Sequence, residues 1–281
     1  MPLRRAAPAL IAASGTAIAL VGVWAVAFGS AAVRRLDVSG LVGFVGLERP
    51  ASEPVAARLA HLADPLELGL FGAALVLVAL ARGRPRAALA VPAILFSANA
   101  TTQVLKPLLA HPRVCDCLGD DRVAAASWPS GHATAAMSLA LCAVVVAPPR
   151  LRPTAAVTGA AFAIAVSFGL LVLGWHYPSD VLAGYGVAAL YTLLAVAALR
   201  AAAARWPERT GREAAARWVA LAAPLVAAAG FAAALAAAVV LVRPHDVAGY
   251  AASHTTFIFV ASGLVAAATA VAGTFAVALR R

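Results

Sequence analysis

The sequence predicts an all-α, polytopic membrane protein, and three observations lead to this prediction. The chain of 281 residues is 63% hydrophobic, and its mean hydropathy is +0.90. Only 12% of the residues are charged, whereas soluble domains contain about 25%. The apolar residues also form runs approaching the roughly 20 residues that cross a bilayer as a helix. The net charge of +10 lies at the ends of these runs, so membrane topology explains it better than nucleic-acid binding does.

The first apolar run covers residues 8–29 and follows two arginines near the N-terminus. At about 1.5 Å per residue, a helix of this length spans about 30 Å of hydrocarbon. A secretory signal peptide is the alternative, because small residues follow at 30–32. The run is longer than the roughly 7–15-residue apolar core of a signal peptide. We therefore expect an anchor that stays in the protein.

The segment from Val33 to Pro65 is polar and is interrupted by prolines. Within it, Val55, Leu59 and Leu62 have the spacing of one helix face, and Ser52 stands before them as a possible N-cap. These features predict a short helix at the membrane interface.

Seven further membrane spans are predicted, which gives eight helices with the first run. They cover about 66–81, 87–105, 132–147, 155–174, 180–199, 219–242 and 257–279. A polar loop over residues 106–131 and a basic linker over residues 200–217 interrupt the series. The alanine-rich run at 219–242 has the weakest signal, because alanine contributes little to insertion.

The basic residues predict the orientation, because cytoplasmic loops are enriched in Lys and Arg. If the N-terminus is cytoplasmic, 14 of the 22 basic residues lie inside: Arg4, Arg5, Arg82, Arg84, Arg86, Arg150, Arg152, Arg200, Arg205, Arg209, Arg212, Arg217, Arg280 and Arg281. We therefore expect a multi-pass plasma-membrane protein with both termini in the cytoplasm.

Three cysteines are too few for a disulfide framework. Cys142 lies in an apolar run and is expected in the core. Cys115 and Cys117 lie in the polar loop, where they are either ordinary thiols or a redox-labile or adventitious metal-binding pair.

Three polar stretches, at 106–113, 128–132 and 174–180, stand between the apolar runs. In the expected topology all three lie on the extracytoplasmic face. Charged side chains are costly at membrane depth and usually have a function there. Lys106 and Arg113 offer two cations, one a point charge and the other a planar fork that suits an anion with several oxygens.

The second stretch, Ser130-Gly131-His132, stands where a span begins. Glycine allows close backbone approach, and the free amides and dipole of a first helical turn favour an anion. In the third stretch His176 and Asp180 are four residues apart, so Asp180 can hold one ring nitrogen and leave the other free. These residues predict a phosphate site in which one histidine attacks phosphorus and the other protonates the departing oxygen.

These motifs resemble the type 2 phosphatidic acid phosphatase (PAP2) superfamily, which includes vanadium haloperoxidases, and in particular its integral-membrane lipid phosphatase branch. The superfamily pattern is Lys, six residues, Arg-Pro; then Pro-Ser-Gly-His; then Ser-Arg, five residues, His, three residues, Asp. Lys106 and Arg113 match the first part, residues 129–132 the second, and His176 with Asp180 the end of the third.

The resemblance implies a role for each matching residue. Lys106, Arg113, Ser130 and the Gly131 amide would bind phosphate. His132 would be the general acid, His176 would form a phosphohistidine, and Asp180 would orient His176. No metal or other cofactor is implied.

The chain departs from the pattern at two places. Val114 replaces the proline that follows the arginine of the first part, and Gly169-Leu170 replaces the Ser-Arg pair of the third. The arginine of that pair binds phosphate in the family, so one cationic donor is missing. We hypothesise that Arg122 or Arg243 replaces it.

The resemblance covers about residues 66–199 and implies a six-helix core within 1–199. A cytoplasmic linker at 200–217 and a two-helix membrane segment at 218–281 would follow. The expected activity is dephosphorylation, at the extracytoplasmic face, of a polyprenyl diphosphate, phosphatidic acid or phosphatidylglycerol phosphate. The alternatives are a weakly catalytic lipid-phosphate binder or lipid transporter and, less expected because it would be soluble, a haloperoxidase.

Overall fold

The computed structural model describes residues 2–111, 123–205 and 244–279, with side chains over 4–111, 123–203 and 248–279. Within these ranges it contains ten α-helices. They are α1 (Pro2–Gly29), α2 (Ala31–Val45), α3 (Glu53–His61), α4 (Pro65–Ala81), α5 (Pro85–Leu108), α6 (Gly131–Val146), α7 (Arg152–Val172), α8 (Pro178–Arg205), α10 (Pro244–Ser253) and α11 (Thr255–Ala278). The span predicted at 219–242 lies outside the described residues, as does most of the linker at 200–217.

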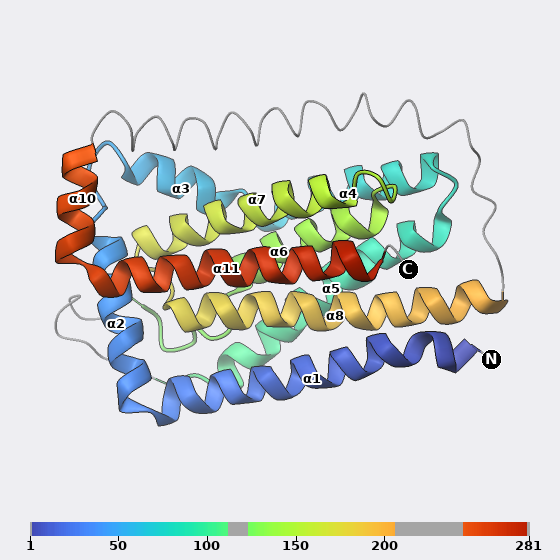
Figure 1. Ribbon diagram of the computed structural model, residues 1–281, viewed down its shortest axis with the longest axis horizontal. Helices are drawn as coiled ribbons and strands as arrows, with labels where there is room; N and C mark the ends of the chain where they lie inside the picture. The colour runs from blue at the N-terminus through green and yellow to red at the C-terminus, as the bar shows by residue number, and fades with distance from the viewer. Residues whose placement is uncertain (1, 112–122, 206–243, 280–281) are drawn as a thin grey trace.

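The long helices α1, α7, α8 and α11 run along the long axis of the molecule (Figure 1). Helices α2 and α10 lie across one end of this bundle, and α1 begins and α11 ends toward the other end, which is called the end with the termini below. The end that carries α2 and α10 is called the α2 end below.

Five of the described helices are long and apolar enough to cross a membrane, and α3 with α4 adds a sixth if this bent pair is one span. The five candidates cover Arg4–Gly29, Pro85–Leu108, Arg152–Val172, Pro178–Ala203 and Thr255–Ala278. Over the described residues, the prediction of an all-α, multi-pass membrane bundle is confirmed.

Helix α6 is the centre of the bundle. It has 16 residues, which is short for a span, and nearly all of them are buried. It packs against α4, α5, α7, α8 and α11. A Cβ atom added at Gly159 of α7 would lie 2.8 Å from the Cβ atom of Ala140, so the two helices approach too closely for any larger residue. Small residues at such contacts are typical of membrane helices.

The sequence analysis missed α2, which occupies part of the segment expected to be polar and irregular. Its apolar face buries Leu41 and Phe44, and the Phe44 ring packs edge-on against Phe168 of α7 and Phe257 of α11. The charged residues near its start interrupt the apolar pattern, so hydropathy alone gives no helix signal there.

The predicted short helix is present as α3, which begins directly after Ser52. Ser52 does not cap the helix through its side chain, because its hydroxyl group donates to the Leu47 carbonyl at 2.7 Å. Val55 is also exposed, whereas Ala56 and Ala60 are buried. Small residues form the packing face because α3 lies close against α7.

Arginines at the end with the termini donate to the C-terminal carbonyl groups of two helices. Arg82 and Arg84 donate to carbonyl groups of the last turn of α6, and Arg84 Nη1 lies 2.9 Å from the Val145 oxygen. Arg152 donates to the Leu279 carbonyl, and Arg200 donates to the Ala278 carbonyl at 2.8 Å. Cations at helix C-termini also interact favourably with the helix dipole.

Candidate active site

The third predicted motif forms a turn between α7 and α8. Gly174 has a φ angle of +69°, which favours glycine and lets the chain reverse after α7. His176 follows and is buried, with 6% of its surface exposed. The turn thus places an imidazole at the α2 end of the bundle, beside the first turn of α8.

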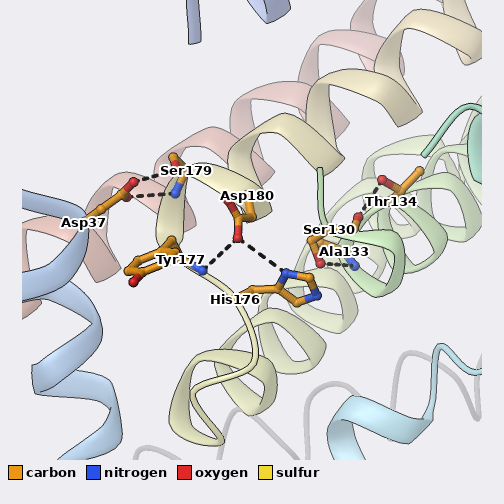
Figure 2. Close-up of polar contacts among 8 residues, drawn as sticks. All are labelled: Asp37, Ser130, Ala133, Thr134, His176, Tyr177, Ser179 and Asp180. Atoms are coloured by element: carbon orange, nitrogen blue, oxygen red, sulfur yellow. Dashed lines mark hydrogen bonds and ion pairs between the residues drawn. The ribbon is translucent and has the colours of Figure 1, made fainter. Parts of the chain in front are cut away.

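Asp180 is fully buried and connects His176 with the start of α8. One carboxylate oxygen, Oδ2, accepts a hydrogen bond from the Tyr177 amide at 3.0 Å. The same oxygen lies 3.5 Å from Nδ1 of His176, an ion-pair contact rather than a short hydrogen bond (Figure 2). The predicted pair is therefore brought together, with Nδ1 facing the carboxylate.

The second motif forms the N-terminus of α6. Ser130 is the N-cap, and its hydroxyl oxygen accepts from the Ala133 amide at 3.3 Å. The Ser130 amide donates to the Asp180 carbonyl at 3.0 Å. A Cβ atom at Gly184 of α8 would lie 2.8 Å from the Ser130 carbonyl oxygen. The starts of α6 and α8 are therefore locked together, which brings the second and third motifs side by side.

Lys106 comes to the same place from the last turn of α5. A Cβ atom at Gly131 would lie 3.7 Å from Lys106 Nζ, so the ammonium group borders the glycine of the second motif. Lys106 also interacts electrostatically with Asp180 and with His132. The Lys106 ammonium group, the amides of the first turn of α6 and the His176 imidazole thus form one cluster. Such a cluster suits an anion with several oxygens.

The segment that carries these motifs matches a known family. Residues 87–204 match the family model of the PAP2 superfamily. Over this segment the chain is similar to the PAP2 superfamily. The chain is also similar to a solved structure described as the first transmembrane PAP2 type phosphatidylglycerolphosphate phosphatase from Bacillus subtilis. The identity is 19%, the similarity covers 65% of this chain and 93% of that one, and the TM-score is 0.48. No curated protein matches the chain.

The segment departs from the PAP2 pattern at Gly169 and Leu170, and the fold explains what these residues do. A Cβ atom at Gly169 would lie 2.6 Å from the Ala56 carbonyl oxygen, so α3 packs directly on this glycine. Leu170 has no exposed surface and belongs to the apolar core. The position at which the family has a phosphate-binding arginine is therefore a core position here.

Three of the predicted phosphate-binding or replacement residues, Arg113, Arg122 and Arg243, lie outside the described residues. Where these arginines lie relative to the site stays a prediction. Cys115 and Cys117 also lie outside the described residues, so the expectations for them stay untested. Cys142 is buried in α6, as predicted.

Asp64 is a site residue that the sequence analysis missed. Its Oδ1 atom lies 2.9 Å from Nε2 of His132, and its Oδ2 atom lies 2.8 Å from Nδ1 of His61. Partial burial raises the pKa of Asp64, but the hydrogen bonds from His132 and His61 outweigh this effect and hold it below its ordinary value. Asp64 is 68 residues from His132 in sequence, and an aspartate before a proline resembles an ordinary N-cap.

Asp37 of α2 is a second missed residue, and it stabilises the start of α8. Its carboxylate accepts from the Ser179 amide at 3.0 Å and from the Ser179 hydroxyl group at 2.5 Å (Figure 2). Both residues are buried. Because Ser179 adjoins Asp180, this contact fixes the turn that presents His176.

Proposed function

We propose that this protein is a lipid phosphatase that hydrolyses a lipid phosphate or diphosphate at the extracytoplasmic face through a phosphohistidine intermediate. One observation carries the proposal. A lysine, a helix N-terminus and a buried His–Asp pair converge at one end of a membrane bundle, and this set can bind a phosphate and attack it.

Phosphate binding is assigned to the groups around the first turn of α6. The Lys106 ammonium group and the Gly131 amide approach the phosphate from neighbouring helices, and the Ser130 hydroxyl group and Arg113 add donors. Fixed donors of this kind stabilise the charge that develops on the phosphoryl oxygens.

In the first chemical step His176 acts as the nucleophile. Asp180 faces its Nδ1 atom, which leaves the lone pair of Nε2 to attack phosphorus. A P–N bond forms, the bond from phosphorus to the leaving oxygen breaks, and His132 gives its proton to that oxygen. Asp180 stabilises the positive charge on the ring of His176.

In the second step water releases the phosphate. His132, now neutral, takes a proton from water as the water oxygen attacks phosphorus. The P–N bond breaks, its electrons return to Nε2 of His176, and inorganic phosphate leaves. For a diphosphate substrate, the leaving group in the first step is the lipid monophosphate.

The extracytoplasmic location rests on the arginines. Most of the described arginines lie at the end with the termini, where several donate to helix carbonyl groups, whereas Arg34, Arg35, Arg49 and Arg58 lie in or beside α2 and α3. The end richer in positive charge is cytoplasmic by the positive-inside rule. The site lies at the α2 end and is therefore assigned to the outer face.

Phosphate release from purified protein tests the activity. Wild type is expected to release phosphate from at least one of polyprenyl diphosphate, phosphatidic acid and phosphatidylglycerol phosphate, and EDTA is expected to leave the rate unchanged. His176→Ala should abolish release from every substrate. His254→Ala is the matched control, because His254 stacks on Tyr250, and it should retain activity. Equal activity of His176→Ala and wild type would refute the mechanism.

The missing arginine leads to a second experiment. Loss of one transition-state donor typically costs about 10²–10³ in rate, so an active enzyme requires a replacement cation. We propose Arg122 or Arg243. Arg122→Ala and Arg243→Ala are assayed separately, and unchanged activity in both variants would exclude the replacement.

A second candidate function is a lipid-phosphate binder or lipid transporter without turnover. The core position of Leu170 favours it, because the pocket then lacks one family donor. Retained lipid-phosphate binding with no release from any of the three substrates would support this function over the first.

A further inference from the structure

We propose that Asp64 is a positioning residue that holds the ring of His132 for proton transfer, and that His61 fixes Asp64 from its other side. This assignment rests on the proposed phosphatase function. It concerns the break between α3 and α4, a segment outside the part of the chain that matches the PAP2 family model.

The break itself presents the carboxylate to His132. Helices α3 and α4 meet at an angle of 52°, and Asp64 stands at this bend as the residue before α4. An aspartate in this position usually accepts from the amides of the following helix turn. Asp64 makes no such capping bond. Its two oxygens are directed to His132 and His61 instead.

The geometry of the His61–Asp64–His132 set fixes which nitrogen of His132 transfers the proton. Nε2 of His132 lies 2.9 Å from Asp64 Oδ1, so Nε2–H is held by the carboxylate. Nδ1 is then the atom that donates to the leaving oxygen. The 2.8 Å contact between His61 Nδ1 and Asp64 Oδ2 keeps the carboxylate from rotating away.

Charge gives the carboxylate a second role. A general acid must carry a proton before the reaction, yet burial of the ring disfavours a positive charge on His132, and so do the neighbouring His176 and Lys106. The Asp64 carboxylate opposes their effect, because an adjacent negative charge favours the protonated imidazole. Without this negative charge, His132 would keep its buried surroundings and the nearby Lys106 ammonium group, and it would lose its proton more readily.

Trp175 shields these contacts and connects them to the nucleophile. Its ring packs against the rings of both His61 and His132, with centroid distances of 5.7 and 6.1 Å. Because Trp175 directly precedes His176, the same turn presents the nucleophile and covers the hydrogen bonds of the acid. The Asp64 carboxylate keeps 33% exposure, so the Trp175 ring shields it from water only in part.

The test compares two substrates that differ in their leaving group. For a lipid phosphate, whose alkoxide must be protonated, Asp64→Asn should lower kcat about 10–100-fold with little change in KM, less than the loss expected for a general acid itself. The leaving group of p-nitrophenyl phosphate needs no proton, so with this substrate Asp64→Asn should have nearly the kcat of wild type. The alkaline limb of the pH–rate profile should also move to lower pH.

Further variants separate positioning from folding. Asp64→Asn added to His132→Ala should cause no further loss, because both changes remove the same function. His61→Ala changes a side chain with 57% exposure, so it tests the His61–Asp64–His132 contacts with little risk to folding. The decrease in kcat that it causes should again be larger for the lipid phosphate than for p-nitrophenyl phosphate. Glu53→Gln removes an exposed carboxylate from α3 and should have wild-type kinetics.

The outcomes distinguish this proposal from the proposed function. An active wild type with an unaffected Asp64→Asn variant, or with equal losses on both substrates, overturns the assignment of Asp64 and leaves the phosphatase intact. A wild type that releases no phosphate from any substrate overturns both.

Discussion

At the residue scale, three buried or half-buried carboxylates perform three different tasks at the α2 end. Asp180 faces the proposed nucleophile His176, Asp64 faces the proposed general acid His132, and Asp37 holds the start of α8. Each is bound by an amide, a hydroxyl group or an imidazole, which offsets the cost of removing a carboxylate from water. The tasks differ because the partners differ.

Asp180→Asn is expected to separate the chemical from the structural role of this residue. The amide oxygen of asparagine can still accept from the Tyr177 amide, so folding should change little. The negative charge opposite His176 is lost, and the rate should fall by about 10²–10⁴, as in other sites where an aspartate orients a catalytic histidine. Thermal unfolding and phosphate release measure the two effects. A large loss of stability with proportionate loss of activity would contradict this division.

Asp64 should also make stability depend on pH. Its pKa is lower in the folded protein than the ordinary value of 3.8. The stability it contributes is therefore fully present above about pH 4 and is lost as the pH falls through the folded pKa. Asp64→Asn should unfold at a lower temperature than wild type at about pH 7, and the difference should shrink at about pH 3. Glu53→Gln serves as the control, and a constant difference at both pH values would contradict the expectation.

Local sequence motifs predicted some residues of the candidate site, and the other residues were found only in the folded structure. His176 and Asp180 are four residues apart, and Ser130 stands at a helix start, so short-range rules suffice to place them. Asp64 and Asp37 act on residues 68 and 142 positions away. No spacing rule covers such distances, because packing of α2 and of the α3–α4 break creates these contacts.

At the element scale, close packing decides which residues the helices tolerate. Helix α3 lies on Gly169 of α7, and α6 lies on Gly184 of α8. The hydropathy of the sequence placed the described spans to within a few residues, because long apolar runs give a strong signal. It missed α2, whose buried Asp37 is polar in sequence yet paired in the structure.

Replacing Leu170 by the arginine of the family pattern should not increase activity, because this packing leaves no room for its side chain. Leu170→Arg would place a guanidinium group in the apolar core of α7, where an unpaired charge costs about 3–5 kcal/mol. The variant should be strongly destabilised and should gain no activity. Leu170→Met preserves volume and should cost less than about 1.5 kcal/mol. Thermal unfolding and phosphate release test both, and a stable Leu170→Arg variant with increased activity would show that the position opens to the phosphate.

At the scale of the whole molecule, the two ends of the bundle have separate tasks. The α2 end carries the proposed site, whereas the end with the termini carries arginines that bind the carbonyl ends of α6 and α11. Those arginines stabilise helix ends and, by the positive-inside rule, also favour a cytoplasmic location. The same residues thus contribute to the packing and, in the proposed topology, to the orientation of the chain.

Cysteine labelling should reveal this orientation in intact cells. In a background with Cys115→Ser and Cys117→Ser, the remaining Cys142 is buried and should not react. Ala51→Cys lies in an exposed turn at the α2 end, and Pro149→Cys lies in an exposed turn between α6 and α7 at the other end. A membrane-impermeant maleimide should label the first variant directly and the second only after permeabilisation. The opposite pattern would place the proposed phosphatase site in the cytoplasm, where its substrates would have to come from the inner leaflet.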